Sequence, residues 1–205
     1  AAKLILGEHP GFVTVSDRYA GYNHLPLAQR QVCWAHLLRD FERIATRTGL
    51  GGRIGKRLLA YGCLLFRWRD KVKDARHFAW LQHRMRLQLQ LGSTQTQCPR
   101  TANTCANLLR VWPALWTFLH NPLVPPTNNA AERALRDYVI QRKLSYCTRS
   151  KRGMEFTERI FSTVQTCKMQ ARVAYDFVHE ALQSWIGHIR PPSLVPEHIH
   201  LQHPA

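Results

Sequence analysis

Acidic residues are scarce in this sequence. Its 205 residues contain 13 Asp and Glu against 29 Lys and Arg, so the formal net charge is +16 and the pI is near 10.3. Such an excess of positive charge repels itself in a compact chain unless a polyanion neutralises it. The imbalance therefore indicates a polyanionic partner, and nucleic acid is the first candidate.

The sequence also lacks long apolar runs. None approaches the roughly 20 residues that cross a bilayer, and the first residues do not have the charged, apolar and small-residue pattern of a signal peptide. We therefore expect a cytoplasmic protein that does not associate with membranes. With 45% hydrophobic and 10% aromatic residues, the chain is predicted to be globular.

Cysteine pairs at redox or metal-binding spacing are missing as well. The six cysteines, at positions 33, 63, 98, 105, 147 and 167, form no Cys-x-x-Cys pair. This pattern argues against a disulfide framework and a structural zinc site, and we expect reduced, mostly buried thiols. Gly49, Gly51, Gly52 and Gly55 are not followed by the Gly-Lys-Ser/Thr of a nucleotide-binding loop, so we interpret them as a turn and expect no small-molecule cofactor.

A short strand is predicted near the start of the chain. Residues 12–16 are Phe-Val-Thr-Val-Ser, and Asp17 follows directly. Val13 and Val15 share one face, and Phe12 makes the other face apolar too, as expected of a central strand covered on both sides. Asp17 would then lie at the carboxyl edge of the sheet, where open α/β sheets bind ligands.

A second carboxylate follows a proline-stiffened loop. Residues 125–136 read Pro-Pro-Thr-Asn-Asn-Ala-Ala-Glu-Arg-Ala-Leu-Arg, which predicts a helix that begins at about Asn129. Glu132 could close a capping box at the start of this helix. Together with a second acid it could instead hold a divalent metal against a phosphodiester, and Asp17 is the acid that the chain offers.

Three blocks of sequence resemble a known family. Residues 16–23 read Ser-Asp-Arg-Tyr-Ala-Gly-Tyr-Asn, residues 33–41 read Cys-Trp-Ala-His-Leu-Leu-Arg-Asp-Phe, and residues 127–136 include the Glu132 helix. In their order and in their residues, these blocks resemble the catalytic region of bacterial insertion-sequence transposases of the sixty-six family. That family belongs to the Asp-Asp-Glu transposases, which have a ribonuclease H-like core.

The resemblance implies roles for the two acids. Asp17 corresponds to the second family aspartate and Glu132 to the glutamate, so both are expected to be catalytic ligands of Mg²⁺ or Mn²⁺. The first family aspartate has no counterpart, because no aspartate precedes Asp17. We therefore expect the C-terminal part of a transposase catalytic region, with weak metal binding and no activity alone.

The predicted fold is α/β, with a partial ribonuclease H-like core of few strands and a large all-helical insertion, so that helices dominate overall. Between Ile54 and Trp116, the periodic apolar residues predict helices and no strands. The chain is predicted to divide into four parts. The first two are the partial core with the second aspartate, residues 1–47, and the helical insertion, residues 48–124. The others are the rest of the core with the Glu132 helix and the closing helices, residues 125–187, and an irregular tail, residues 188–205.

DNA contacts are predicted after Glu132. A short strand is expected at residues 144–148, a basic loop at 149–153, and two closing helices at 154–170 and 175–186, with their apolar stripes facing inward. The expected phosphate-binding side chains are Arg136, Arg142, Lys143, Arg149, Lys151 and Arg152. DNA is the expected partner, and self-association is possible. The alternative function is a non-catalytic DNA-binding remnant or regulator.

Overall fold

The computed structural model describes residues 2–7, 10–69, 71, 75–146 and 148–195. They form two compact units, which we call the N-terminal unit, Ala1–Ala130, and the C-terminal unit, Ala131–Ala205. The described elements are helix-dominated and include one small parallel sheet, which confirms the predicted balance of secondary structure.

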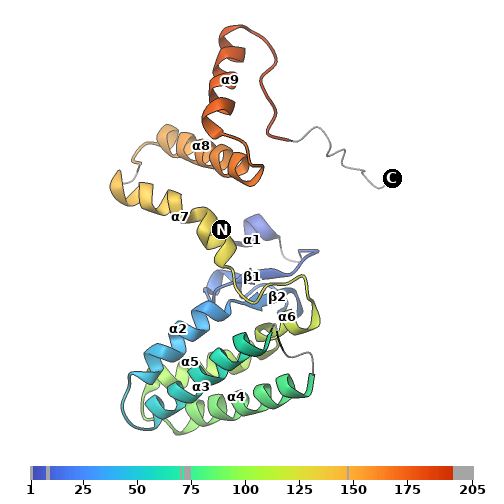
Figure 1. The fold of residues 1–205 in the computed structure, drawn as a ribbon. Coiled ribbons are helices and arrows are strands. Elements are labelled where there is room, and N and C mark those ends of the chain that lie inside the picture. Colours follow the sequence, from blue (N-terminus) through green and yellow to red (C-terminus); the bar gives the residue numbers. More distant parts are fainter. Residues whose placement is uncertain (1, 8–9, 70, 72–74, 147, 196–205) are drawn as a thin grey trace. The chain divides into compact units, whose positions relative to one another are not determined.

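The N-terminal unit contains the sheet and most of the helices (Figure 1). Its elements are α1 (Ala2–Leu6), β1 (Thr14–Ser16), η1 (Ala20–Tyr22), η2 (Leu27–Gln29), β2 (Arg30–Val32), α2 (Trp34–Ala45), α3 (Gly49–Arg69), α4 (Ala75–Gln95), α5 (Pro99–Arg110), η3 (Trp112–Leu115) and α6 (Thr117–His120). The C-terminal unit contains α8 (Lys151–Met169), α9 (Ala174–Ile186) and all but the first two residues of α7 (Asn129–Leu144).

The two strands run parallel. Thr14 pairs with Arg30 and Ser16 with Val32, and the Cys33 amide extends the ladder by donating to the Ser16 carbonyl at 2.8 Å. The strand after Pro10 is shorter than predicted. Our expectation of a strand covered on both faces is not met, because β1 pairs only with β2 in the described part of the chain and Phe12 is 58% exposed.

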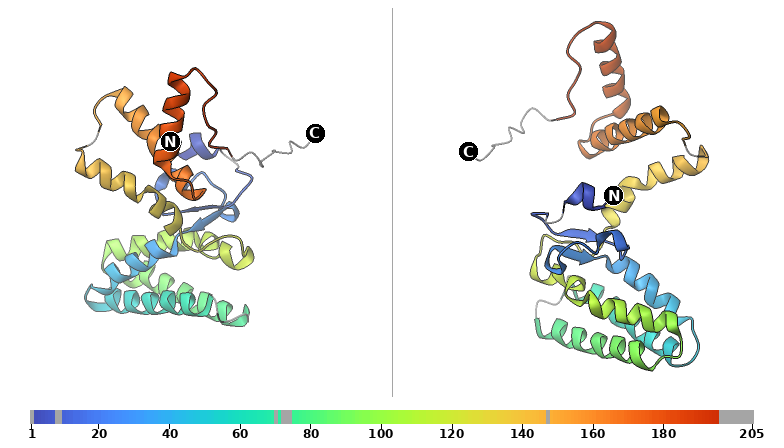
Figure 2. Two further views of the ribbon diagram at one scale, coloured as in Figure 1. Left: turned by 45° about the horizontal axis from the view of Figure 1, so that its top comes forward. Right: turned by 180° about the vertical axis from the view of Figure 1, so that it is seen from behind.

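A helical bundle forms the core of the N-terminal unit. Figures 1 and 2 show α2, α3, α4 and α5 packed beside one another. Their buried apolar side chains recur every three or four residues, the spacing that places them on one helix face. They include Trp34, Leu37, Phe41, Ile54, Leu58, Leu65, Leu81, Met85, Leu89 and Leu108. In the described residues of this segment, the regular elements are helices, as predicted.

The predicted glycine turn is wrong, because α3 begins at Gly49 and contains the other glycines of the cluster. Their role is close packing. A Cβ atom on Gly55 would lie 2.3 Å from the Ala45 amide nitrogen, and one on Gly52 would lie 1.8 Å from the Arg47 carbonyl oxygen. The absence of side chains lets the backbones of α2 and α3 approach each other directly, which outweighs the low helix propensity of glycine.

The connection between α4 and α5 is short and spans residues 96–98. Helix α4 continues to Gln95, and α5 starts with Pro99 in its first turn, where proline is tolerated. Gly92 lies inside α4 beneath α5, because a Cβ atom there would meet the Cys105 sulfur at 2.5 Å.

The C-terminal unit corrects two further expectations. Helix α7 runs to Leu144 and Tyr146 follows with a φ of 54°, so the described residues of 144–148 form no strand. The predicted basic loop is mostly the start of α8. Ser150 caps that helix, since its Oγ accepts a hydrogen bond from the Gly153 amide at 3.1 Å.

The apolar stripes of α7, α8 and α9 do not face inward as predicted. Leu135 is 60% exposed, Phe156 66%, Leu182 54% and Trp185 76%. Among the described residues of this unit, Cys167 is the buried hydrophobic side chain. Amphipathic periodicity predicts which face of a helix requires a partner surface, but it does not provide that surface.

Candidate metal-binding and DNA-binding site

Asp17 lies directly after β1, at the carboxyl edge of the sheet, as the sequence predicts. Its Oδ1 accepts a hydrogen bond from the Tyr19 amide at 3.0 Å, a local turn typical of aspartate. The side chain borders an open cleft of about 600 Å³. The other lining residues are Arg18, Tyr19, His36, Arg39, Asp40, Glu42 and Arg43.

Asp40 is the second carboxylate of this cleft. It lies on α2 and is only 7% exposed. Arg18 and Arg43 both donate hydrogen bonds to its carboxylate, so Asp40 is an ion-pair partner. With both oxygens held by guanidinium groups, Asp40 is not positioned to bind a metal ion. Asp17 and the exposed Glu42 are the other acids of this cleft, and Asp17 is the one that the family resemblance marks as a candidate ligand.

Arg30 positions the loop that carries Asp17, and sequence reasoning missed it. The side chain is 2% exposed, and its Nη2 donates to the Asp17 carbonyl at 2.9 Å. The guanidinium also donates to the Ser16 hydroxyl and the Tyr22 carbonyl, both at 3.3 Å. Burial lowers the Arg30 pKa from its usual value, and Asp17 and Tyr22 partly oppose that shift. Little in the sequence signals this role, because β2 reads Arg-Gln-Val and two of its three residues are polar.

A second buried polar side chain fixes the segment after α5. Gln31 is fully buried, its Nε2 donates to the Leu115 carbonyl at 3.1 Å, and its Oε1 accepts from the Phe118 amide at 2.9 Å. Trp34 adds a bond from Nε1 to the same Leu115 carbonyl at 2.7 Å. These bonds attach η3 and α6 to β2, so the chain returns from the helical bundle to the sheet.

The chain then approaches Glu132 along the carboxyl end of β2. The Trp34 amide donates to the Pro126 carbonyl at 2.9 Å, and the Asn128 amide donates to the Cys33 sulfur at 3.4 Å. Both contacts lie within the N-terminal unit. Helix α7 begins at Asn129 as predicted, with Glu132 exposed in its first turn. Glu132 belongs to the C-terminal unit.

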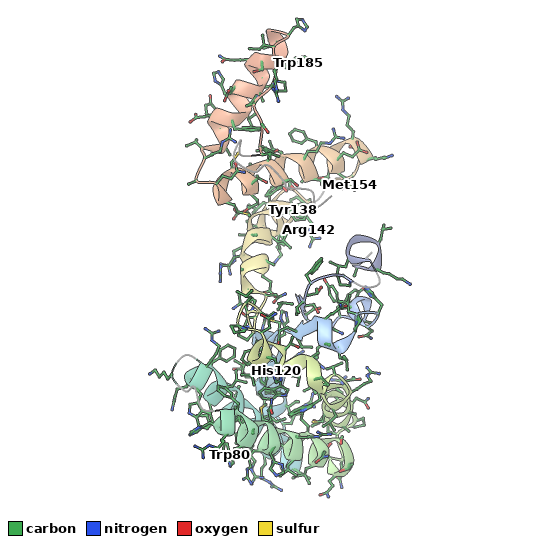
Figure 3. All side chains as sticks on the ribbon, turned by 90° about the vertical axis from the view of Figure 1, so that its right-hand side faces the viewer. Trp80, His120, Tyr138, Arg142, Met154 and Trp185 are labelled. Carbon is green, nitrogen blue, oxygen red and sulfur yellow. The ribbon has the colours of Figure 1, made fainter. Side chains whose placement is uncertain are left out.

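The six cations expected to bind DNA are all exposed in the C-terminal unit. Arg136, Arg142 and Lys143 lie on α7; Arg149 precedes α8, and Lys151 and Arg152 open it. Between these two helices is a groove of about 650 Å³, bordered by Tyr138, Arg142 and Met154 (Figure 3). The Tyr138 and Phe161 rings meet edge to face at 5.3 Å across α7 and α8.

The described residues contain no cluster of metal-binding side chains near these acids and cations. Within the described ranges, no group of three or more His, Cys, Asp and Glu side chains is placed to hold a metal ion. Among the described helices, none is long and apolar enough to cross a membrane. The described cysteines are free thiols, and Cys33, Cys105 and Cys167 are buried. Three tail histidines, His198, His200 and His203, lie outside the described residues.

Comparison with protein families places this chain in a family of transposases. The family model described as Transposase IS66 family matches residues 1–156 of the 205. The chain therefore belongs to the IS66 transposase family, which confirms the resemblance carried by the three sequence blocks. A search of curated proteins and a search of solved structures each gave no match. Transposases act on DNA, so family membership implies DNA as a partner.

Proposed function

We propose that Asp17 and Glu132 bind the same divalent ion, Mg²⁺ or Mn²⁺, in a transposase site that cuts DNA and joins the freed 3′-hydroxyl to target DNA. Membership of the IS66 family supports the reaction class. The observation that carries the residue assignment is the anchoring of residues 126–128. The Asn128 amide is bound to Cys33 at the end of β2, beside the strand that Asp17 follows, and Glu132 comes four positions later.

The metal ion and the side chains would make different contributions to the reaction. When bound, the ion would stabilise the entering and leaving oxygens of an in-line displacement at phosphorus. Carboxylate oxygens are the ligands that such hard cations prefer. Arg30 would keep the Asp17 loop in place, and the start of α7 would hold Glu132 on a rigid element. The same proposal assigns β1 and β2 to a ribonuclease H-like core.

Exposed cations of the C-terminal unit would hold the DNA backbone. In this proposal Arg136, Arg142, Lys143, Arg149, Lys151 and Arg152 bind phosphate oxygens and position the strand without reading its sequence. Their exposure leaves the charged groups accessible. DNA affinity should therefore fall steeply as salt rises, and each removed contact should reduce the slope of log affinity against log salt by about 0.9 for duplex DNA.

Two carboxylates bind a metal ion weakly. A pair of ions about 4 Å apart normally needs a bridging carboxylate as well. No aspartate occurs among residues 1–16, so we propose that residues 1–205 alone bind Mn²⁺ weakly and do not catalyse strand transfer.

Mn²⁺ binding to the purified chain tests the proposal, measured by electron paramagnetic resonance of the free ion. Asp17→Asn and Glu132→Gln should each weaken binding about tenfold or more. Glu155→Gln is the control, because Glu155 is an exposed acid on α8 paired only at the surface with Lys151. Equal binding by the wild-type chain and both variants would contradict the shared site.

A non-catalytic DNA-binding protein is the second candidate. The net charge of +16 and the lack of a three-acid cluster among the described residues favour it. It predicts salt-sensitive DNA binding with no Mn²⁺ affinity at Asp17 or Glu132. Strand transfer by the isolated chain that disappears in Asp17→Ala would exclude this candidate, and it would also refute the proposed inactivity of residues 1–205.

A further inference from the structure

Three helices of the N-terminal unit contain no acidic residue over their described lengths. Helices α3, α4 and α5 contain five, three and two Lys or Arg residues, respectively, and no Asp or Glu. Ion pairing within these helices therefore cannot neutralise their positive charge. A surface of this kind attracts polyanions, and its attraction is strongest at low salt.

Helices α3 and α4 run antiparallel and share one exposed face. Early in α3, Arg57 Nη1 donates to Gln88 Oε1 of α4 at 3.4 Å. One turn later, the ring of Tyr61 meets that of Trp80 edge to face at 6.1 Å. Arg57 and Tyr61 are four residues apart, which places them on the same stripe of α3. On α4, Trp80 and Arg84 form the matching stripe.

Trp80 contacts two aromatic side chains of α3 on this face. Its ring is tilted against that of Trp68 at 6.1 Å, so one side is supported by the neighbouring helix. The side chain nevertheless remains 48% exposed (Figure 3). Core packing alone would favour burial of so large an apolar side chain. An exposed indole that is held in place by a neighbouring ring can instead stack with a planar aromatic group.

Arginines flank the aromatic group on both helices. Arg53 and Arg57 lie one turn apart on α3, and Arg84 lies one turn beyond Trp80 on α4; all three are exposed. Phosphate groups and bases alternate along a nucleic acid strand, so a ring bordered by cations matches the chemistry of that polymer. An acidic peptide would match the cations but would leave the exposed indole without a partner.

We propose that this α3–α4 face, consisting of Arg53, Arg57, Tyr61, Trp68, Trp80 and Arg84, binds single-stranded DNA. An unpaired base stacks on Trp80, and the arginines bind the adjoining phosphates. Unpaired bases are required, because the bases of a duplex are already stacked and their flat faces are covered. The site is separate from Asp17 and Glu132 and needs no metal ion.

The test uses the full chain in chelator, with a fluorescent oligothymidylate of about 20 nucleotides and a duplex of equal length as probes, followed by anisotropy. Trp80→Ala should weaken oligothymidylate binding about fivefold or more, with duplex binding unchanged. Arg57→Ala and Arg84→Ala should weaken oligothymidylate binding more than duplex binding, and each should reduce the single-strand salt slope by about 0.7. Circular dichroism checks that every variant is folded.

Matched controls come from the C-terminal unit. Trp185→Ala removes a tryptophan that is 76% exposed, and Arg159→Ala removes an exposed arginine of α8. Trp185→Ala should leave oligothymidylate binding unchanged, and Arg159→Ala should weaken it less than Arg57→Ala does. Asp17→Asn should also leave it unchanged, so a failure of the metal site and a failure of this site give different results.

Three results would overturn the inference. If Trp80→Ala bound oligothymidylate as tightly as the wild-type chain does, a base would not stack on Trp80. Equal losses for oligothymidylate and duplex in Trp80→Ala would assign the face to the phosphate backbone alone. Stronger competition by polyglutamate than by unlabelled oligothymidylate would assign the face to an acidic protein partner.

Discussion

The two units differ in how their helices are covered. In the N-terminal unit, α2 to α5 share a continuous apolar core, and β2 is buried beneath η3 and α6. In the C-terminal unit, α7 to α9 are equally regular helices, yet their large apolar side chains remain mostly exposed. Similar local sequence signals thus produce helices in both units, but a dense interior forms in only one.

The difference also separates the candidate functional residues. Asp17 follows a strand that is fixed by Arg30, a buried side chain with several hydrogen bonds. Glu132 and the six proposed phosphate-binding cations lie on exposed helices of the other unit. A buried network fixes one orientation for the groups that it holds, whereas exposed side chains can adapt to a partner. This contrast suits the proposed backbone contacts of the exposed cations, whereas the two proposed metal ligands are divided between the units.

The largest expected effect compares two tryptophans. Trp34 is fully buried, bonded to the Leu115 carbonyl and in edge contact with Trp116 at 5.1 Å, so Trp34→Ala should destabilise the chain by about 3–5 kcal/mol. Trp185→Ala should change stability by no more than about 0.5 kcal/mol, because that side chain is 76% exposed. Urea unfolding followed by circular dichroism measures both. Equal losses would mean that the contrast between the units does not hold.

A smaller effect is expected from two glycines that differ in what surrounds them. At Gly55 a new methyl group would strike the backbone of α2, so Gly55→Ala should cost about 1–3 kcal/mol. At Gly153 the obstacle is the Thr148 methyl group at 2.4 Å, and a side chain can move. Gly153→Ala should therefore stay within about 1 kcal/mol of wild type, since alanine also favours the helix. Thermal unfolding distinguishes the two, and a tolerated Gly55→Ala would contradict the close packing of α2 and α3.

The smallest expected effect concerns pH and the core of the N-terminal unit. Burial raises the pKa of the Cys105 thiol to about 11, with Arg47 opposing the shift. The folded state thus holds its proton more tightly than the unfolded state. The resulting stabilisation is present below pH 9 and is lost as the pH rises towards 11, by about 1–2 kcal/mol.

Paired unfolding curves at pH 8 and pH 10.5 measure this loss. Cys105→Val should remove that part of the pH dependence, whereas Cys63→Ser, which replaces an exposed thiol, should retain it. The same slope in wild type and Cys105→Val would show that Cys105 does not contribute.

The sequence predicted many of the elements through local signals. The helix start at Asn129, the strand before Asp17 and the helical segment between α2 and α6 follow from caps, prolines and apolar periodicity. Errors arose where distant residues decide the outcome. The glycines of α3 suggest a turn until the backbone of α2 is placed against them, and the charges around Asp40 suggest an exposed surface until Arg18 is brought to it.

By itself the sequence determined the charge, the helical character and the family of this protein, because composition, periodicity and motif order are properties of neighbouring residues. The tertiary structure alone decided that Arg30 and Gln31 are buried, that α3 packs through its glycines and that Trp80 stays exposed against the rings of α3. Burial depends on which distant surfaces meet. An amphipathic stripe specifies the need for a partner surface but does not identify it.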